Sequence, residues 1–299
     1  MTQLLALLLA VVLVWPVGAA EITPSDVYTQ ALRIKAEMEL LADHLQIRGE
    51  KAVQPVRMVL QPRHVWQKTG LILLKINRFR ALHGMPRLTV SDVEPVPNLE
   101  PAMNYEQTQR ILAEIFIIKR RLGIDATTAP LAPATDKTPQ DVFNLFNAIS
   151  MQWDVLNQHE VDAVTIYAEV RRLHADIDAV LRQLRIQDVA FPPAKEPATT
   201  LEECLRVSFE LMAEVQRLQR LAGIAVVDFA PFRKAAGVLP SDVLNMVGMA
   251  LAELQPLKAS LGLNHVITPA TAFQEEANLA DVRQLMGYAM HKLKQVRTL

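Results

Sequence analysis

Cysteine, glycine and aromatic residues are all scarce in this sequence, and neither sign of charge predominates. The 299 residues include one cysteine, 10 glycines and 5% aromatics, and the formal net charge is −1. A single cysteine, Cys204, excludes an internal disulfide, so the fold must depend on packing. Little glycine and few aromatics argue against an all-β domain. The balanced charge provides no bulk attraction to nucleic acid, and we expect no nucleic-acid partner.

Long hydrophobic runs are missing after the first twenty residues. Leu4 to Trp15 is a continuous apolar run, and small residues follow it up to Ala20. This pattern predicts a secretory signal peptide over residues 1–20, although no Lys or Arg precedes the run. The run is short for a membrane span, so an uncleaved anchor is the less favoured alternative. We therefore expect a periplasmic or secreted protein with no membrane span after cleavage.

Helix start and stop signals are frequent in the rest of the chain. Thr23, Pro24 and Asp26 resemble a capping box, and residues 138–141 repeat the pattern. Glycine after the last apolar residue of a segment, as at Gly123, is typical of a helix end. We interpret the recurring Pro-x-Asp-Val pattern as a helix start and not as a catalytic motif.

Core positions recur with a 4-3-4-3 spacing, which is the pattern of helices packed at shallow angles. Eight segments carry it, and apolar residues make up 51% of the chain, enough for a sizeable core. The sequence therefore predicts an all-α fold of eight helices packed through such seams. The seams cover residues 27–45, 65–83, 104–122, 142–156, 166–184, 204–222, 243–261 and 282–296.

The eight segments form a longer repeat, because matching residues of the first four and the last four segments are separated by one constant offset. The offset is 139 residues for three pairs, Val27 with Ile166, Gly84 with Gly223 and Pro101 with Pro240. Independent helices would not keep one offset through their loops. We predict two tandem, internally duplicated four-helix units, residues 21–160 and 161–299.

Long connectors rich in proline join the helices, at residues 86–100, 125–138 and 187–199. Proline makes such segments extended. About fourteen extended residues reach roughly 45 Å, farther than the roughly 33 Å of a helix of about twenty-two residues. Parallel and antiparallel neighbours both remain open, and we favour antiparallel packing.

No constellation of catalytic residues is visible in the sequence. There is no nucleophile elbow, phosphate loop, zinc-metalloprotease pair or dinucleotide fingerprint. His174 and Asp178 lie four residues apart, which is an ordinary pair on a helix surface. Cys204 lies on a core position, so we expect a buried thiol. We predict no catalytic residue, no metal site and no cofactor.

Four polar residues occupy core positions and are the candidate ligand-binding residues: Thr69, Asn104, Thr108 and Ser208. Polar atoms inside a bundle can hydrogen-bond a small ligand. The alternative is structural, since Ser and Thr commonly bond to a carbonyl of the preceding turn and a core Asn can fix the register. Pro256 lies within the seventh expected helix, and a kink there would open space beside it.

Two functions fit these observations. The first is an exported, non-enzymatic module that binds or organises proteins in the bacterial cell envelope, with a protein partner there. The second is a periplasmic small-ligand-binding or sensory helical bundle. A stable duplicated bundle without catalytic residues favours the first, and the polar core positions with Pro256 favour the second.

Overall fold

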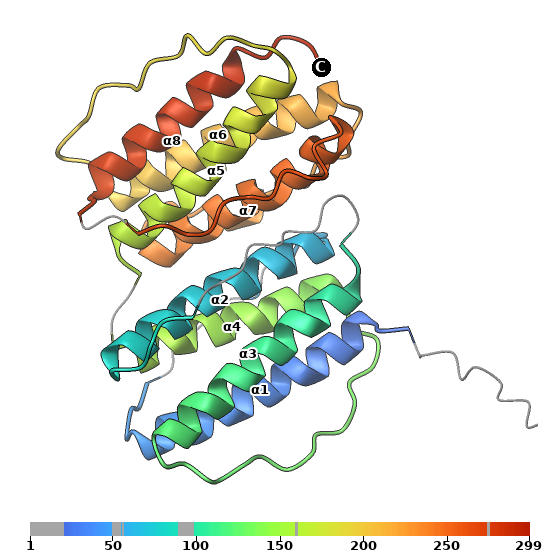
Figure 1. Cartoon of the computed structure of the whole chain (residues 1–299), viewed down its shortest axis with the longest axis vertical. Coiled ribbons are helices and arrows are strands. Elements are labelled where there is room, and N and C mark those ends of the chain that lie inside the picture. The colour runs from blue at the N-terminus through green and yellow to red at the C-terminus, as the bar shows by residue number, and fades with distance from the viewer. Residues whose placement is uncertain (1–20, 50–54, 56, 89–98, 159–160, 274–275) are drawn as a thin grey trace, which may run out of the picture.

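A computed structural model describes residues 21–49, 55, 57–88, 99–158, 161–273 and 276–299. The described part of the chain holds eight α-helices and no strand, which confirms the all-helical fold (Figure 1). The predicted signal peptide lies outside the described residues. The elements are α1 (Pro24–His44), α2 (Pro62–Leu82), α3 (Pro101–Arg121), α4 (Pro139–Leu156), α5 (Ala163–Gln183), α6 (Leu201–Leu221), the 3-10 turn η1 (Ala230–Phe232), α7 (Pro240–Ser260) and α8 (Leu279–Lys294).

The helices begin and end where the sequence signals predict. At the start of α1, Asp26 Oδ2 accepts the Thr23 backbone N–H at 2.8 Å, and Thr23 in turn caps the Asp26 N–H. The same reciprocal cap begins α4, which confirms that Pro-x-Asp-Val marks a helix start. Gly123 follows α3 with φ +75°, a conformation that favours glycine, and Ile124 N–H then donates to Lys119 O.

The helices form two four-helix units. In the first unit α1 and α2 each pack against both α3 and α4, and in the second α5 and α6 each pack against both α7 and α8. The neighbour order is therefore the same in the two units after the 139-residue offset. A common origin of the units and their bounds at residues 160 and 161 stay predictions.

Helices within a unit run parallel, so the antiparallel order that we favour from the sequence is wrong. The first turns of α1, α2, α3 and α4 surround one small hollow at an end of the first unit. In the second unit, Cys204 and Leu279 make contact between the first turns of α6 and α8. Gln219 of α6 and Glu253 of α7 meet in the later halves of their helices.

The connectors explain this order, because they return along the helices. Residues 128, 134 and 137 of the α3–α4 connector bond in turn to Glu37, Thr29 and Ser25 of α1. The connector thus runs antiparallel to α1 and places the start of α4 beside the start of α1 (Figure 1). Parallel helices gather their positive dipole ends, and the acidic capping residues of α1 and α4 offset this charge.

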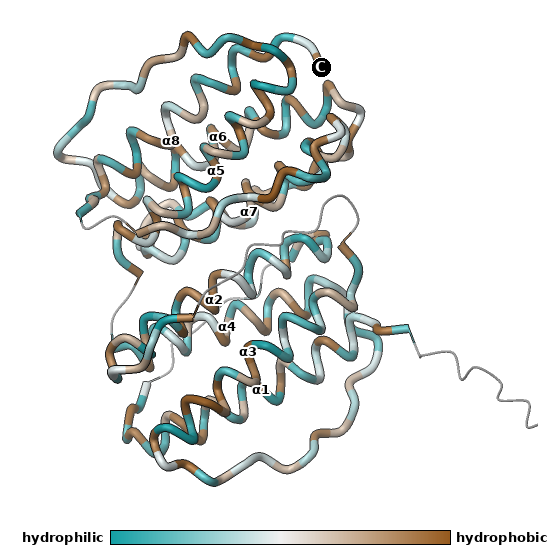
Figure 2. Tube along the Cα trace, viewed as in Figure 1, coloured by the Kyte–Doolittle hydropathy of each residue, from teal (hydrophilic) through white to brown (hydrophobic). Residues whose placement is uncertain are grey.

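The predicted seams form the core. Most seam positions of α1, α5 and α7 are fully buried, including Ile34, Ile177 and Leu254. Hydrophobic and hydrophilic residues alternate along the helices in Figure 2, as expected of amphipathic helices. Within the described residues, no helix combines the length and apolarity that a membrane crossing requires.

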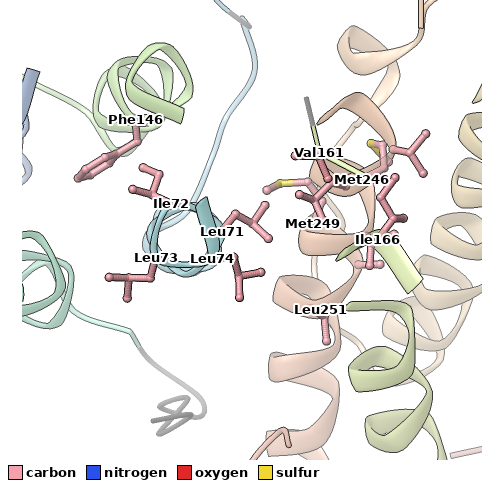
Figure 3. Packing of buried hydrophobic residues seen from close by; sticks show 14 of the residues in the cluster. Leu71, Ile72, Leu73, Leu74, Phe146, Val161, Ile166, Met246, Met249 and Leu251 are labelled. Atoms are coloured by element: carbon pink, nitrogen blue, oxygen red, sulfur yellow. The ribbon is translucent and has the colours of Figure 1, made fainter. Parts of the chain in front are cut away.

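The two units meet through α2 and α7. Leu71 and Leu74 of α2 point toward Met246 and Met249 of α7, while Ile72 faces the interior of the first unit (Figure 3). Arg63 contacts Glu253 and Lys68 contacts Asn245, so the two helices cross antiparallel. These helices are apolar on two faces because each is packed on both sides.

At the 139-residue offset α6 corresponds to α2, and α3 corresponds to α7. These two helices do not form a second contact of the α2–α7 kind. At the 139-residue offset Leu71 corresponds to Glu210, and Met249 corresponds to Arg110. Glu210 is 43% exposed and pairs with Arg206. At these two positions α3 and α6 therefore carry a charged residue where α2 and α7 carry the apolar residues of the junction.

Candidate ligand-binding cavity between the two units

A cavity of about 730 Å³ lies where the two units and two connectors meet. Its polar wall comes from α4 and the start of α7, and apolar side chains such as Met151 and Phe232 complete it. This volume is in the range typical of small-molecule sites. The lining residues are Pro55, Arg57, Asn147, Met151, Pro231, Phe232, Arg233, Lys234, Ala235, Ala236, Gly237, Leu239, Ser241, Asp242 and Asn245.

Lys68 of α2 lies directly behind the polar wall and is 1% exposed. Its Nζ donates to Asn147 Oδ1 at 2.6 Å and to Asn245 Oδ1 at 2.7 Å. An ammonium group only donates, which fixes the orientation of both amides. The Nδ2 of each asparagine is therefore the group that remains to donate to a molecule in the cavity. The ring centroid of Phe143 lies 5.7 Å from Nζ.

The environment of Lys68 disfavours its charged form. Burial lowers the pKa of Lys68 well below its ordinary value, and the positive charge of Lys75 lowers it further. The carboxylates of Asp154 and Asp242 act in the opposite direction but do not outweigh burial. Strongly shifted groups beside a cavity are frequent at functional sites.

A second polar cluster joins the units beside this cavity. Glu253 is fully buried and its Oε1 accepts from His64 Nε2 at 2.7 Å and from Arg63 at 2.8 Å. Its Oε2 accepts from Gln219 at 2.7 Å. Burial alone would raise the pKa of Glu253, but these partners outweigh it and lower the pKa. Arg63 also lines a neighbouring pocket of about 640 Å³, so the cluster reaches the surface on one side.

His64 is held in its neutral form. Its Nδ1 accepts the Gln61 backbone N–H at 2.8 Å, in the role that Asp plays in the other caps. The proton is therefore on Nε2, which donates to Glu253. Burial lowers the pKa of His64 despite the opposing effect of Glu253. The neutral imidazole thus caps the start of α2 through Nδ1 and bonds across the junction to α7 through Nε2.

The four residues that the sequence predicts for ligand binding lie elsewhere. Thr69 donates to Trp66 O, Thr108 to Asn104 O and Ser208 to Leu205 O, all within their own helices. Asn104 donates to Pro62 O, while its buried Oδ1 has no partner within the described residues. Thr69, Asn104 and Thr108 lie in the first unit and Ser208 lies in the second, so the structure does not bring the four together. Their role in ligand binding stays a prediction.

The surroundings of Cys204 and His174 are those of residues that stabilise the fold. Cys204 is fully buried, which confirms the expected buried thiol, and burial raises the pKa of this thiol to about 12. His174 Nδ1 lies 3.5 Å from Asp178 Oδ2, as the helix spacing predicts. Among the described residues, no three His, Cys, Asp or Glu side chains are grouped to hold a metal ion.

Sequence reasoning missed Lys68, Asn147 and Asn245 because nothing in their spacing relates them. Lys68 and Asn245 are 177 residues apart and meet only through the α2–α7 contact. One signal was present, since α7 is apolar on both faces around Met246 and Met249 and so indicates a helix packed on two sides. No protein-family model, no curated protein and no solved structure matches this chain.

Proposed function

We propose that the protein is an exported, non-enzymatic binding protein that holds a small molecule in the cavity between its two helical units. The observation that carries this proposal is the position of Lys68, buried behind the polar wall of the cavity and bonded to Asn147 and Asn245. A buried ammonium group is costly, and strongly perturbed groups beside a cavity are frequent at functional sites. The walls also combine a few polar groups with apolar surface, as ligand sites do.

A thermal-shift screen with metabolites and anions tests this proposal. A ligand that binds only the folded protein raises its stability, by about 2.7 kcal/mol at a hundred times the dissociation constant. Ala236→Trp should abolish the shift, because Ala236 is an exposed residue of the cavity wall. The matched control is Ala194→Trp, an exposed alanine of another connector, which should keep it. Shifts that Ala236→Trp leaves unchanged would place the ligand elsewhere.

A protein-interaction role is the second candidate, and the α5–α6 connector favours it. Val189 is 64% exposed and Phe191 is 81% exposed. The connector is held in place, because Val189 N–H donates to Gln295 and Pro193 O accepts from Gln284 of α8. Crosslinking in an envelope extract should then capture a partner with the native chain and lose it with Phe191→Ser. Equal capture by both chains would rule out this surface.

A further inference from the structure

Four buried lysines in the described part of the chain each bond to a carboxylate. Lys75 donates to Asp154 at 2.7 Å and to Ser150 O at 2.9 Å, and Lys258 donates to Asp176 at 2.9 Å and to Thr268 at 3.2 Å. In each case a carboxylate balances the ammonium charge and a neutral oxygen accepts a second hydrogen. Two other buried lysines, Lys119 and Lys292, also bond to carboxylates.

Lys68 departs from this pattern. Both of its acceptors, Asn147 Oδ1 and Asn245 Oδ1, are neutral amide oxygens. The two carboxylates that influence it electrostatically are already paired, Asp154 with Lys75 and Asp242 with Lys234 at 2.8 Å. Within the described residues, Lys68 is thus a fully buried lysine that lacks a bonded carboxylate.

The cavity is the place from which a carboxylate can be supplied. Asn147 and Asn245 line the cavity, and each uses its Oδ1 to accept from Lys68, so Nδ2 is the amide donor left for a molecule bound there. Arg57 adds a further positive charge at the wall. Charge-assisted hydrogen bonds of this kind are stronger than neutral ones, particularly beside a buried charge.

We propose that the cavity binds an organic carboxylate with an apolar body, which bonds to the amides of Asn147 and Asn245 and stabilises the charged form of Lys68 behind them. This inference rests on the proposed function. The apolar body follows from the rest of the wall, where Met151, Phe232 and Leu239 offer hydrophobic surface. An inorganic anion would leave that surface in contact with water.

Matched pairs of probes test the inference by titration calorimetry with the full-length mature protein. Octanoate and phenylacetate are compared with octanamide and phenylacetamide, which keep the shape without the charge, and inorganic phosphate supplies charge without an apolar body. We expect each carboxylate to bind at least about tenfold more tightly than its amide, a ratio that corresponds to about 1.4 kcal/mol. Phosphate should bind more weakly than either carboxylate.

Variants then assign the preference to Lys68. In Lys68→Met the carboxylate should lose most of its advantage over its amide, because Lys68 is gone and only the charges at the wall, such as that of Arg57, remain. Asn245→Leu gives a second variant, should Lys68→Met not fold, and should weaken carboxylate binding. Leu74→Ala is the matched control, since it loosens the same junction away from the cavity wall and should keep the preference.

The outcomes separate the two proposals. Equal binding of carboxylates and amides by the native protein, or a preference that Lys68→Met retains undiminished, would overturn the carboxylate inference and leave a ligand-binding cavity. Tighter binding of phosphate than of octanoate would also overturn it. Absence of binding by all five probes, together with no shift in the metabolite screen, would overturn the proposed function itself.

Discussion

Lys119 of α3 and Glu37 of α1 form a fully buried ion pair, and the residues 139 positions later, Lys258 and Asp176, form the same pair between α7 and α5. A connector threonine completes each pair, Thr128 bonding to Glu37 in the first unit. Both pairs follow the 139-residue offset, but neither involves the capping residues or apolar seam positions from which the offset was recognised. They are what a duplication predicts, and common ancestry of the units stays a prediction.

Removing the charge of one carboxylate should destabilise the unit that contains it. Glu37→Gln leaves Lys119 buried without an anion, so we expect a loss of about 3–5 kcal/mol in the free energy of unfolding. Asp176→Asn should do the same in the second unit. Urea denaturation measures the loss, and hydrogen exchange should locate it in α1 and α3 or in α5 and α7. The double variant Glu37→Leu, Lys119→Met should recover most of it, and a loss as large as that of Glu37→Gln would contradict this account.

Glu253 should matter more to stability than its counterpart Glu114. Both face the neighbouring helix of their own unit, but Glu253 is fully buried at the junction, whereas Glu114 is 14% exposed and bonds to Arg80. Glu253→Gln leaves Arg63 without its anion and removes the carboxylate that accepts from His64, and we expect a loss of about 3 kcal/mol or more. For Glu114→Gln we expect a smaller loss, because Arg80 keeps its bond to Pro86 O. Equal losses in urea denaturation would show that the junction does not depend on this carboxylate.

The junction should weaken in acid. The pKa of His64 is lowered from 6.5, so below about that pH the unfolded chain binds a proton that the folded chain does not. Stability is therefore fully present above pH 6.5 and falls as the pH drops toward the folded pKa. Glu253, whose pKa is also lowered from 4.5, adds a loss in the same direction at lower pH.

The matched variant for this pH effect is His64→Gln, which keeps an acceptor for Gln61 and a donor for Glu253. We expect a flatter dependence of the unfolding free energy between pH 7 and pH 5 than in the native protein. An unchanged slope would assign the acid sensitivity to other groups.

Two glycines within helices should respond in opposite ways to alanine. A Cβ at Gly70 of α2 meets nothing within 4 Å, so Gly70→Ala should stabilise the protein by about 0.5–1 kcal/mol. A Cβ at Gly287 of α8 would lie 2.8 Å from Cγ of Pro193 in the α5–α6 connector. Gly287→Ala should therefore displace the connector and cost about 1–3 kcal/mol. Stabilisation by both changes in thermal denaturation would show that the connector is not packed on α8.

Much of the fold was predictable because it follows from local signals. Capping residues such as Thr23 and Asp26 fix where a helix begins, and the 4-3 seam identifies its buried face. Helix direction was not predictable, since it depends on hydrogen bonds between a connector and a distant helix, such as Ala134 N–H to Thr29. The sequence sets the length of a connector but not the direction in which it returns.

The candidate site was less predictable than the fold. Polar seam positions such as Thr108 attract attention, yet its hydroxyl is bonded to Asn104 O in the same helix. Lys68 looks like an ordinary surface lysine until α7 covers it. Its role depends on contacts across the junction, and no periodic pattern encodes them.

The nitrogen-15 signal of the Lys68 side chain reports whether a carboxylate binds beside this lysine. Protein labelled with nitrogen-15 at its lysine side chains is titrated with octanoate, and the spectrum of Lys68→Met assigns the signal. We predict a saturable shift of the Lys68 Nζ signal with octanoate, larger than the shift of any other lysine and absent with octanamide. A Lys68 signal that does not move while octanoate saturates the protein would contradict a carboxylate site in this cavity.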